Sequence, residues 1–314
     1  MHVALYFYDR LPVKGYGGTQ RVVVWLARGL AELGHRVTLI AGAGSRVPEA
    51  TLVPVDVRLA RRPDFDVAPF IPRDADLLHS FVPLRVPPAS PWVWTLEGNL
   101  KRGETAPANT IYVSADHARR NGSVSFVYNG LDPAEFVFRA EKADYDLFLG
   151  RLHKEKGYHW AIEGCRRTGR KLVVAGGWRP SLSRLLKFVG SVDGAEKAEW
   201  LAGARCLWMP ALWDEPFGLT LAEALVSGTP VLGTRRGSLP EIVSPDVGAL
   251  GDTLEDLVQL VETAARKDPH ACRERALRHF SHRAMAAEYV RFYRHYLETG
   301  SLPAGRPAGA SVGA

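Results

Sequence analysis

Short apolar runs alternate with helical patterns along the first half of the chain. Residues 2–8 form an apolar run, residues 19–34 repeat apolar side chains at helical spacing, and residues 35–42 are apolar again. Four more short runs, bounded by turn residues, cover 75–83, 91–99, 110–116 and 124–132. Strands interleaved with helices predict a parallel sheet that is covered on its faces.

The same alternation begins again near Asp144. Expected strands cover 145–152, 170–177, 187–192, 205–211 and 229–234, and expected helices cover 158–167, 195–204 and 216–228. A last helix follows Ser281, because apolar side chains repeat there along one helical stripe. We therefore predict an α/β protein with two tandem Rossmann-like domains. Ligands of open α/β sheets bind at the carboxyl ends of the strands, so the site should lie in a central cleft that draws on both domains.

The poorly periodic stretch 138–144 is the expected linker between the two domains. We predict an N-terminal domain over 1–140 and a C-terminal domain over 141–282. Residues 283–299 form the last helix, and the Gly- and Pro-containing tail 300–314 is predicted to be disordered.

Composition narrows the classes of function. The 314 residues are 46% hydrophobic and 24% charged, which suits two globular domains. The net charge of +6 is spread over the chain without a basic block, which argues against nucleic acid as a partner. It is compatible with an anionic small ligand or with peripheral contact to a membrane surface.

The sequence also indicates where in the cell the protein is located. No apolar run approaches about 18 residues, so we expect no transmembrane helix. The first residues suggest a strand rather than a signal peptide, because a basic segment and a cleavage site are missing. Three widely separated cysteines show no metal spacing. They favour a reduced, cytoplasmic location, with peripheral contact at the inner membrane face left open.

A glycine-rich loop follows the first expected strand and leads into the first helix. Gly15, Gly17 and Gly18 permit a tight turn and close approach of an anionic ligand to backbone N–H groups. A plain glycine turn is the alternative. Binding of a nicotinamide cofactor is disfavoured, since the glycine spacing is wrong and the next strand ends without an acidic residue.

Two cations, Arg151 and Lys156, follow the first expected strand of the second half. At the carboxyl end of a strand they are placed to clamp a diphosphate, with arginine as a planar fork and lysine as a point charge. Solvated loop cations are the alternative interpretation.

The stretch "WDEPFGLTLAEALVSG" carries two glutamates, Glu215 and Glu223, on either side of an expected helix start. The first N–H groups of that helix have no partner within the helix, and they favour an anion or sugar hydroxyls. Glu223 lies inside an apolar helix, where a buried carboxylate needs hydrogen bonds. A vicinal diol supplies two donors, so a ribose is a suitable partner for it; a surface glutamate is the alternative.

These residues resemble a known family. "EPFGLTLAE" is similar to the E-x7-E signature of retaining glycosyltransferases of family 4, which have the GT-B fold. Five further segments fall in the order typical of that family, which extends the resemblance over residues 1 to about 295. These segments are "GGTQRVVVWLARGLAELGH", "FVYNGLDPAEF", "FLGRLHKEKG", "KFVGSVDGAEKAEWLAGARCLWMPA" and "GTPVLGTRRGSLPEIV".

The resemblance implies a role for each matching residue. Arg151 and Lys156, with Gly17 and Gly18, would hold the donor diphosphate, and Glu223 would bind the ribose. The donor sugar would contact Glu215 and the backbone of Phe217, Gly218 and Leu219. The nucleoside base would lie against the backbone near Val189 and Val192. The N-terminal domain would face the acceptor, the C-terminal domain would bind the nucleotide-sugar, and the last helix would cross back to the N-terminal domain.

One position departs from the family. Where the family often has a histidine, this chain has Glu97, which we predict to be catalytic together with Glu215. The Glu97 carboxylate would accept a hydrogen bond from a sugar hydroxyl or stabilise positive charge at the anomeric carbon. Asn99 and His117 are further candidates for the missing contact.

The predicted activity is retaining transfer of a sugar from a UDP- or GDP-sugar to an acceptor hydroxyl, with no metal and no cofactor. The acceptor would be a saccharide, a lipid-linked molecule or another small molecule. Three alternatives remain: a donor-binding module or degenerate transferase, a nucleotide-sugar epimerase, and a metal-dependent GT-A transferase. The last would use one of the D-x-D pairs at 64/66, 74/76 and 144/146.

Overall fold

The computed structural model describes residues 1–13, 15 and 17–309, and the chain divides into two compact units. Unit 1 holds Met1–Leu131 together with the chain from Ser281 onward, and unit 2 holds Asp132–Phe280. Each unit contains one six-stranded parallel sheet, so the prediction of two Rossmann-like α/β domains is confirmed. No helix in the described part of the chain is both long enough and apolar enough to span a bilayer.

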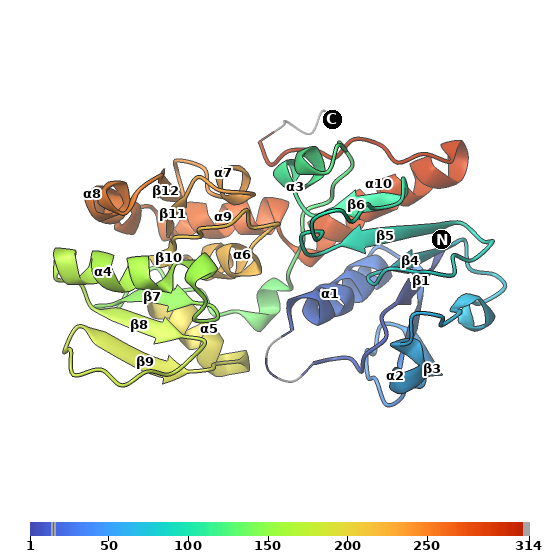
Figure 1. The fold of residues 1–314 in the computed structure, drawn as a ribbon, viewed down its shortest axis with the longest axis horizontal. Helices are drawn as coiled ribbons and strands as arrows, with labels where there is room; N and C mark the ends of the chain where they lie inside the picture. Colours follow the sequence, from blue (N-terminus) through green and yellow to red (C-terminus); the bar gives the residue numbers. More distant parts are fainter. Residues whose placement is uncertain (14, 16, 310–314) are drawn as a thin grey trace. The chain divides into compact units, whose positions relative to one another are not determined.

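The sheet of unit 1 has the strand order β3-β2-β1-β4-β5-β6 (Figure 1). Its strands are β1 (His2–Tyr6), β2 (Arg36–Gly42), β3 (Thr51–Val55), β4 (Leu77–Ser80), β5 (Trp92–Leu96) and β6 (Thr110–Tyr112). The central strands β1 and β4 are buried along their whole length, as expected for a sheet covered on both faces. The helices are α1 (Gly18–Glu32), α2 (Val57–Ala60), α3 (Ala115–Arg120) and α10 (His282–Thr299), with the 3-10 turn η1 at Ala68–Phe70.

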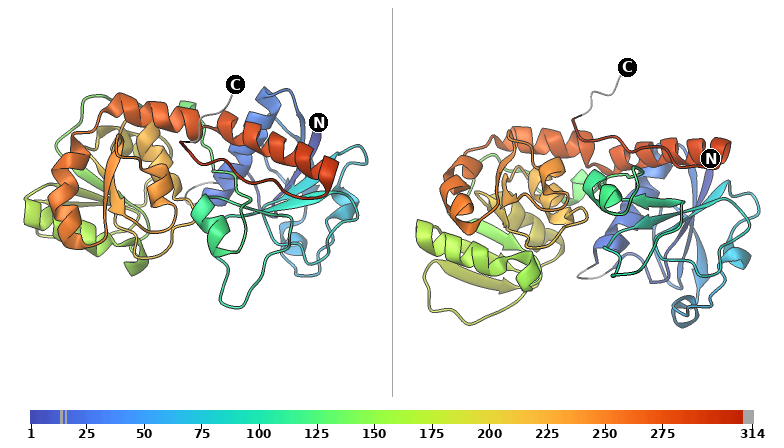
Figure 2. Two further views of the ribbon diagram at one scale, coloured as in Figure 1. Left: turned by 90° about the horizontal axis from the view of Figure 1, so that it is seen from above. Right: turned by 45° about the horizontal axis from the view of Figure 1, so that its top comes forward.

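The last helix, α10, packs closely against the first helix, α1 (Figure 2). The contact is close because Gly29 of α1 has no side chain. A Cβ at that position would lie 2.5 Å from the carbonyl oxygen of His282. At the start of α10, Glu32 of α1 receives hydrogen bonds from His282 and Arg283. Residues from the two ends of the chain therefore build one unit.

The sheet of unit 2 has the order β12-β11-β10-β7-β8-β9. Its strands are β7 (Asp146–Leu149), β8 (Leu172–Ala175), β9 (Leu186–Gly190), β10 (Leu207–Met209), β11 (Val231–Thr234) and β12 (Gly248–Gly251). The helices are α4 (Tyr158–Thr168), α5 (Gly194–Gly203), α6 (Leu219–Val226), α7 (Leu239–Ile242), α8 (Leu254–Ala265) and α9 (Pro269–His279), with 3-10 turns η2 (Pro133–Glu135) and η3 (Lys154–Lys156). Phe148, Cys165, Val174 and Trp208 belong to the apolar core that joins α4 and α8 to the sheet.

Two boundaries differ from the predicted ones. The units meet in sequence at 131/132 and 280/281, not at residue 140, and 138–144 is not a free linker. Phe138 packs against Gly228, and Lys142 donates hydrogen bonds to the Ala202 carbonyl and the Thr229 hydroxyl, so this segment belongs to unit 2. Its aromatic and basic side chains find partners that a local pattern does not reveal.

Two other expectations fail in detail. The run 124–132 forms no strand and contributes two isolated bridges, Tyr112 with Phe126 and Leu131 with Ser281. Disorder was predicted for 300–314, yet the Gly305 N–H donates to the Val124 carbonyl at 2.9 Å, and the Ala304 carbonyl accepts from Arg291. The prediction is wrong for 300–309, and 310–314 lie outside the described residues.

Candidate functional site

In unit 2, a lysine and a glutamate come together at the carboxyl end of the sheet. Lys156, on the turn after β7, places its Nζ 2.5 Å from Oε2 of Glu215, which lies on the loop after β10. The Trp213 indole N–H donates to the same carboxylate oxygen at 2.9 Å, and the Lys156 ammonium lies 4.6 Å from the centre of the Trp213 ring. Glu215 is buried, so its negative charge is balanced by one cation and one N–H donor.

Two glycines hold this arrangement by close backbone contact. Gly237 has φ +58°, and a Cβ there would lie 2.4 Å from both the backbone N and O of Glu215. Gly157 has φ +71°, and a Cβ there would lie 1.8 Å from the Pro210 carbonyl oxygen. No other residue type fits at either position, because the left-handed conformation and the missing side chain are both required.

The loop after Glu215 leads into α6, which begins later than the sequence suggested. The predicted start was Pro216, but the helix starts at Leu219 with Gly218 as N-cap at φ +80°. The Phe217 carbonyl accepts a hydrogen bond from the Ser238 hydroxyl at 2.7 Å, and its ring packs edge-on against Phe280. Glycine ends the loop because the turn needs positive φ, which proline at N1 does not provide.

Glu223 lies one turn into α6 and is also paired with a lysine. Lys197 of α5 donates to Oε1 of Glu223 at 2.6 Å; the Glu223 side chain is buried, at 5% exposure, and that of Lys197 is part-buried, at 12%. The Lys197 ammonium also lies 5.5 Å from the centre of the Phe136 ring. Sequence reasoning missed Lys197, because a lysine in a mixed helical pattern resembles an ordinary surface residue.

The other residues that were predicted to bind the nucleotide-sugar lie at separate positions in the two units. Arg151 is exposed, two residues beyond the end of β7. Val189 lies in β9 and Val192 follows that strand, both partly buried. In unit 1, Gly17 is the N-cap of α1 and Gly18 is its first residue.

In unit 1, Glu97 directly follows β5 and is fixed by one side chain that the sequence had not singled out. Asn129 donates its Nδ2 to Oε2 of Glu97 at 2.7 Å. Glu97 Oε1 and Asn129 Oδ1 are both buried, and neither has a hydrogen-bond partner among the described residues. Two acceptor atoms without donors form a site suited to a hydroxyl-bearing ligand.

The surroundings of Glu97 change its titration. Burial raises the pKa of the Glu97 carboxyl to about 7, and the hydrogen bond from Asn129 opposes that shift. The negative charge of Glu97 contributes to the raised pKa of Tyr289, whose main cause is burial. Tyr289 and Thr95 share a 2.8 Å hydrogen bond, and Thr95 is also 2.7 Å from Nε2 of His79. A buried chain of polar side chains therefore lies behind Glu97.

The other two candidates in unit 1 differ: Asn99 is bound by Arg120, whereas both ring nitrogens of His117 are buried without a hydrogen-bond partner among the described residues. The side-chain Oδ1 of Asn99 accepts two hydrogen bonds from Arg120, each at 3.1 Å. His117 lies inside α3, with its ring edge-on to Tyr112. Burial, followed by the charge of Arg120, lowers the pKa of His117 to about 4, so its imidazole is neutral at pH 7.

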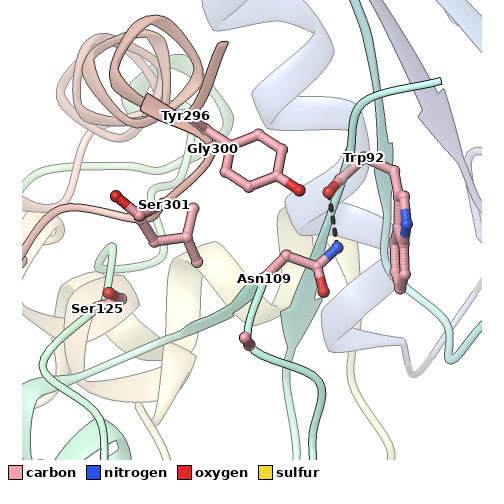
Figure 3. Close-up of a pocket in the computed structure, with 8 residues that line it drawn as sticks. Trp92, Asn109, Ser125, Tyr296, Gly300 and Ser301 are labelled. Atoms are coloured by element: carbon pink, nitrogen blue, oxygen red, sulfur yellow. Dashed lines mark hydrogen bonds between the residues drawn. The ribbon is translucent and has the colours of Figure 1, made fainter. Parts of the chain in front are cut away.

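A separate pocket of about 460 Å³ lies at the amino ends of β5 and β6 (Figure 3). Trp92, Asn109, Ser125, Tyr296 and Ser301 contribute to its lining. The Asn109 amide donates to the Trp92 carbonyl across one wall. Because Glu97 follows the opposite end of β5, this pocket is not part of the predicted site. Within the described residues, no three His, Cys, Asp or Glu side chains are grouped closely enough to hold a metal.

Unit 2 is similar in sequence to a family of known proteins. Residues 134–278, nearly all of unit 2, match the family model of glycosyl transferases group 1. The chain is 30% identical over 200 residues to the glycogen synthase of Mycobacterium tuberculosis, covering 54% of this chain and 48% of that protein. It spans between 40% and 63% of the length of the first curated relatives that it matches.

Solved structures extend the likeness to both units. AviGT4, a glycosyltransferase involved in avilamycin A biosynthesis, has a TM-score of 0.78 at 27% identity, covering 96% of this chain and 99% of that chain. Anabaena Alr3699/HepE, in its complex with UDP-glucose, has a TM-score of 0.65 at 15% identity, covering 93% and 98%.

The fold is therefore the GT-B fold of glycosyltransferases. Residues 134–278 are similar to group 1 glycosyl transferases, and the curated relatives match part of the chain.

Proposed function

We propose that this chain is a retaining glycosyltransferase that moves a sugar from a nucleotide-sugar to an acceptor hydroxyl without a metal or cofactor. The observation that carries the proposal is the pair of buried glutamates in unit 2, Glu215 and Glu223, each held by a lysine from another element. They lie within the segment that matches the group 1 glycosyltransferase model.

The donor diphosphate would bind at Lys156, Arg151 and the first N–H groups of α6. Lys156 is already held at the carboxyl end of the sheet by Glu215 and Trp213. As the bond to the sugar breaks, negative charge builds on the leaving diphosphate. Fixed cations and helix N–H groups stabilise that charge without reorganisation, which is the task a divalent ion performs in other enzymes. Gly17 and Gly18, in unit 1, remain proposed as further diphosphate contacts.

The ribose would bind at Glu223. Its Oε1 accepts a hydrogen bond from Lys197, which fixes the direction of the carboxylate. A vicinal diol donates two hydrogen bonds, and an ionised carboxylate is a strong acceptor for them. The base would lie along β9, near Val189 and Val192.

The transferred sugar would contact Glu215 and the backbone from Phe217 to Leu219. We propose attack from the same face as the departing group. The bond between the anomeric carbon and the diphosphate oxygen breaks, and the acceptor oxygen bonds to that carbon. The acceptor proton passes to the leaving diphosphate. Both groups then occupy the same face, so the anomeric configuration is kept.

Glu97 and Asn129 of unit 1 would bind a hydroxyl of the transferred sugar or of the acceptor. Their two unpartnered acceptor atoms support this role. With a pKa of about 7, Glu97 is available near neutral pH both as an acceptor and, when protonated, as a donor. Asn99 contributes less, because it is bound by Arg120. His117 remains proposed as a further contact, since both of its ring nitrogens are buried without a hydrogen-bond partner among the described residues.

A thermal-shift panel of UDP-, GDP- and ADP-sugars tests the donor class, because a ligand that binds the folded state raises the melting temperature by mass action. The best donor should then support transfer to a saccharide, lipid-linked or small-molecule acceptor. Failure of every nucleotide-sugar to shift the melting temperature would contradict the proposal.

A donor-binding module without transferase activity is a second candidate, favoured by the glutamate at position 97. Donor binding without transfer or hydrolysis, across a broad acceptor panel, would support the module. Conversion of the donor to its epimer without an acceptor would instead identify an epimerase.

A further inference from the structure

We propose that the loop between β8 and β9 in unit 2 docks onto an anionic lipid surface. This loop carries Trp178 and Leu182, the two most exposed large hydrophobic side chains in the described part of the chain, at 70% and 105% exposure. A tryptophan and a leucine four residues apart form one exposed apolar tip, and such exposed apolar patches mark interaction surfaces. Figure 1 shows the loop as a coil at the β9 edge of the second sheet.

The base of the loop is firmly held, while its tip is not. Gly176 has φ +111°, and a Cβ there would lie 2.2 Å from the Gly150 carbonyl oxygen. Gly177 lies against the Leu152 side chain. From Trp178 to Leu182 every residue is exposed. The apolar tip is therefore presented on a fixed base rather than folded back onto the sheet.

The charges around the tip are all positive. Residues 176–190 contain Arg179, Arg184 and Lys187 and no acidic residue. All three are exposed, and none forms an ion pair within the described residues. The Arg179 guanidinium lies 4.9 Å from the centre of the Tyr158 ring, and the Lys187 ammonium lies 4.8 Å from that of Trp200, so their stems are supported while their charge is uncompensated.

The exposed apolar tip and the positive charges around it fit an anionic lipid surface better than a protein partner. Tryptophan is favoured at the level of lipid headgroups, where its ring is partly in water and partly in hydrocarbon. Arginines beside an inserted apolar tip reach the anionic headgroups. The leucine side chain at the tip would insert into the hydrocarbon region, which electrostatic attraction to the headgroups alone does not achieve. An acidic protein would account for the arginines, but charge alone does not account for the exposed tryptophan and leucine between them.

Vesicle binding of the full chain tests the proposal directly. The probes are vesicles made of equal parts phosphatidylcholine and phosphatidylglycerol, compared with pure phosphatidylcholine, in a flotation assay. We expect binding to the mixed vesicles that weakens with salt. The variant Trp178→Ser/Leu182→Ser should bind roughly tenfold more weakly. The affinity of the variant Arg179→Ser/Arg184→Ser for the mixed vesicles should fall roughly fivefold for each arginine removed.

Matched controls remove similar groups elsewhere. Val124→Ser removes an exposed apolar side chain from unit 1, and Arg166→Ser/Arg278→Ser removes two exposed arginines from other parts of unit 2. Both should bind vesicles like the wild type. All four variants alter exposed side chains, so circular dichroism and melting temperature should stay unchanged.

The proposal stands independently of the proposed transferase activity, because its readout contains no donor or acceptor. Absence of binding by the wild type, or equal losses in loop and control variants, would overturn it. Loss of the donor-induced thermal shift in the Trp178→Ser/Leu182→Ser variant, with vesicle binding intact, would also overturn it. That result would make the loop a substrate contact instead.

Discussion

Lys197 and Glu223 form a largely buried ion pair between α5 and α6, with Nζ and Oε1 2.6 Å apart. Removing one partner of such a pair leaves the other charge buried and unpaired, which is strongly destabilising. If Glu223 binds the ribose, the lysine is also a positioning residue, because it fixes the direction of the carboxylate.

Replacing Lys197 by methionine should therefore weaken donor binding by about tenfold or more, beyond its cost in stability. Isothermal calorimetry with the best donor measures the loss, and Lys197→Arg should restore part of it. Lys142→Met is the matched control. Lys142 is another part-buried lysine of unit 2, and it donates to the Ala202 carbonyl and the Thr229 hydroxyl. That control should lose stability and keep its donor affinity.

Replacing Lys156 by methionine should weaken binding of the nucleoside diphosphate by about tenfold or more and leave binding of the free nucleoside unchanged. The reason is that a charge-assisted hydrogen bond to phosphate contributes about 1.5–3 kcal/mol, and the nucleoside carries no phosphate. Competition titrations with the two ligands compare the losses. Lys154→Met, two residues away and exposed, provides the control. Equal losses for both ligands would argue against the diphosphate assignment.

Gly237→Ala should destabilise unit 2 by about 3 kcal/mol or more and reduce transfer, because the new Cβ would overlap the backbone of Glu215. Gly169→Ala places a Cβ at a similar positive φ with no atom within 4 Å. It should cost only about 1–2 kcal/mol. Urea unfolding of both variants separates the steric effect from the backbone conformation.

The raised pKa of Glu97 predicts a specific pH dependence of stability. A carboxyl group whose pKa is higher in the folded state than in the unfolded chain holds its proton more tightly when folded. Its contribution to stability is present below the unfolded pKa of about 4.5, and it is lost as the pH rises through about 7. Glu97→Gln, which does not ionise, should therefore match the stability of the wild type below about pH 4.5. Above about pH 7 it should exceed the stability of the wild type by roughly 3 kcal/mol.

Urea unfolding across this pH range measures that difference. Glu298→Gln, at an exposed glutamate of unit 1, should leave the pH profile of the wild type unchanged. A wild-type profile parallel to that of Glu97→Gln would show that Glu97 titrates normally.

Transfer activity should survive an excess of EDTA, because the proposed mechanism stabilises the leaving diphosphate with Lys156, Arg151 and helix N–H groups. Initial rates with and without the chelator test this. Complete loss of activity that Mg²⁺ restores would reject the metal-free mechanism and reopen the D-x-D alternative.

The local hydrophobic pattern predicted most strands correctly and predicted the ends of the elements poorly. Apolar periodicity predicted most strands and both sheets, but it missed β3 and β12, which are short and include exposed or partly buried residues. It also began α6 at Pro216, although the backbone turns at Gly218 and the helix starts one residue later. That turn is fixed by Gly237 and Ser238, about twenty residues further along the chain.

The sequence by itself determined the α/β class, the two sheets and the two glutamates of the E-x7-E stretch, because periodicity and motif spacing are local properties. Only the tertiary structure decided which side chains complete the site. Lys197 reaches Glu223 from α5, Lys156 reaches Glu215 from the turn after β7, and Asn129 reaches Glu97 across 32 positions of sequence. Each of these partners lies far away in the chain. Lys156 and Glu215 meet because the parallel strands β7 and β10 end at one edge of the sheet. Lys197 and Glu223 meet through the packing of α5 against α6, which no local pattern records.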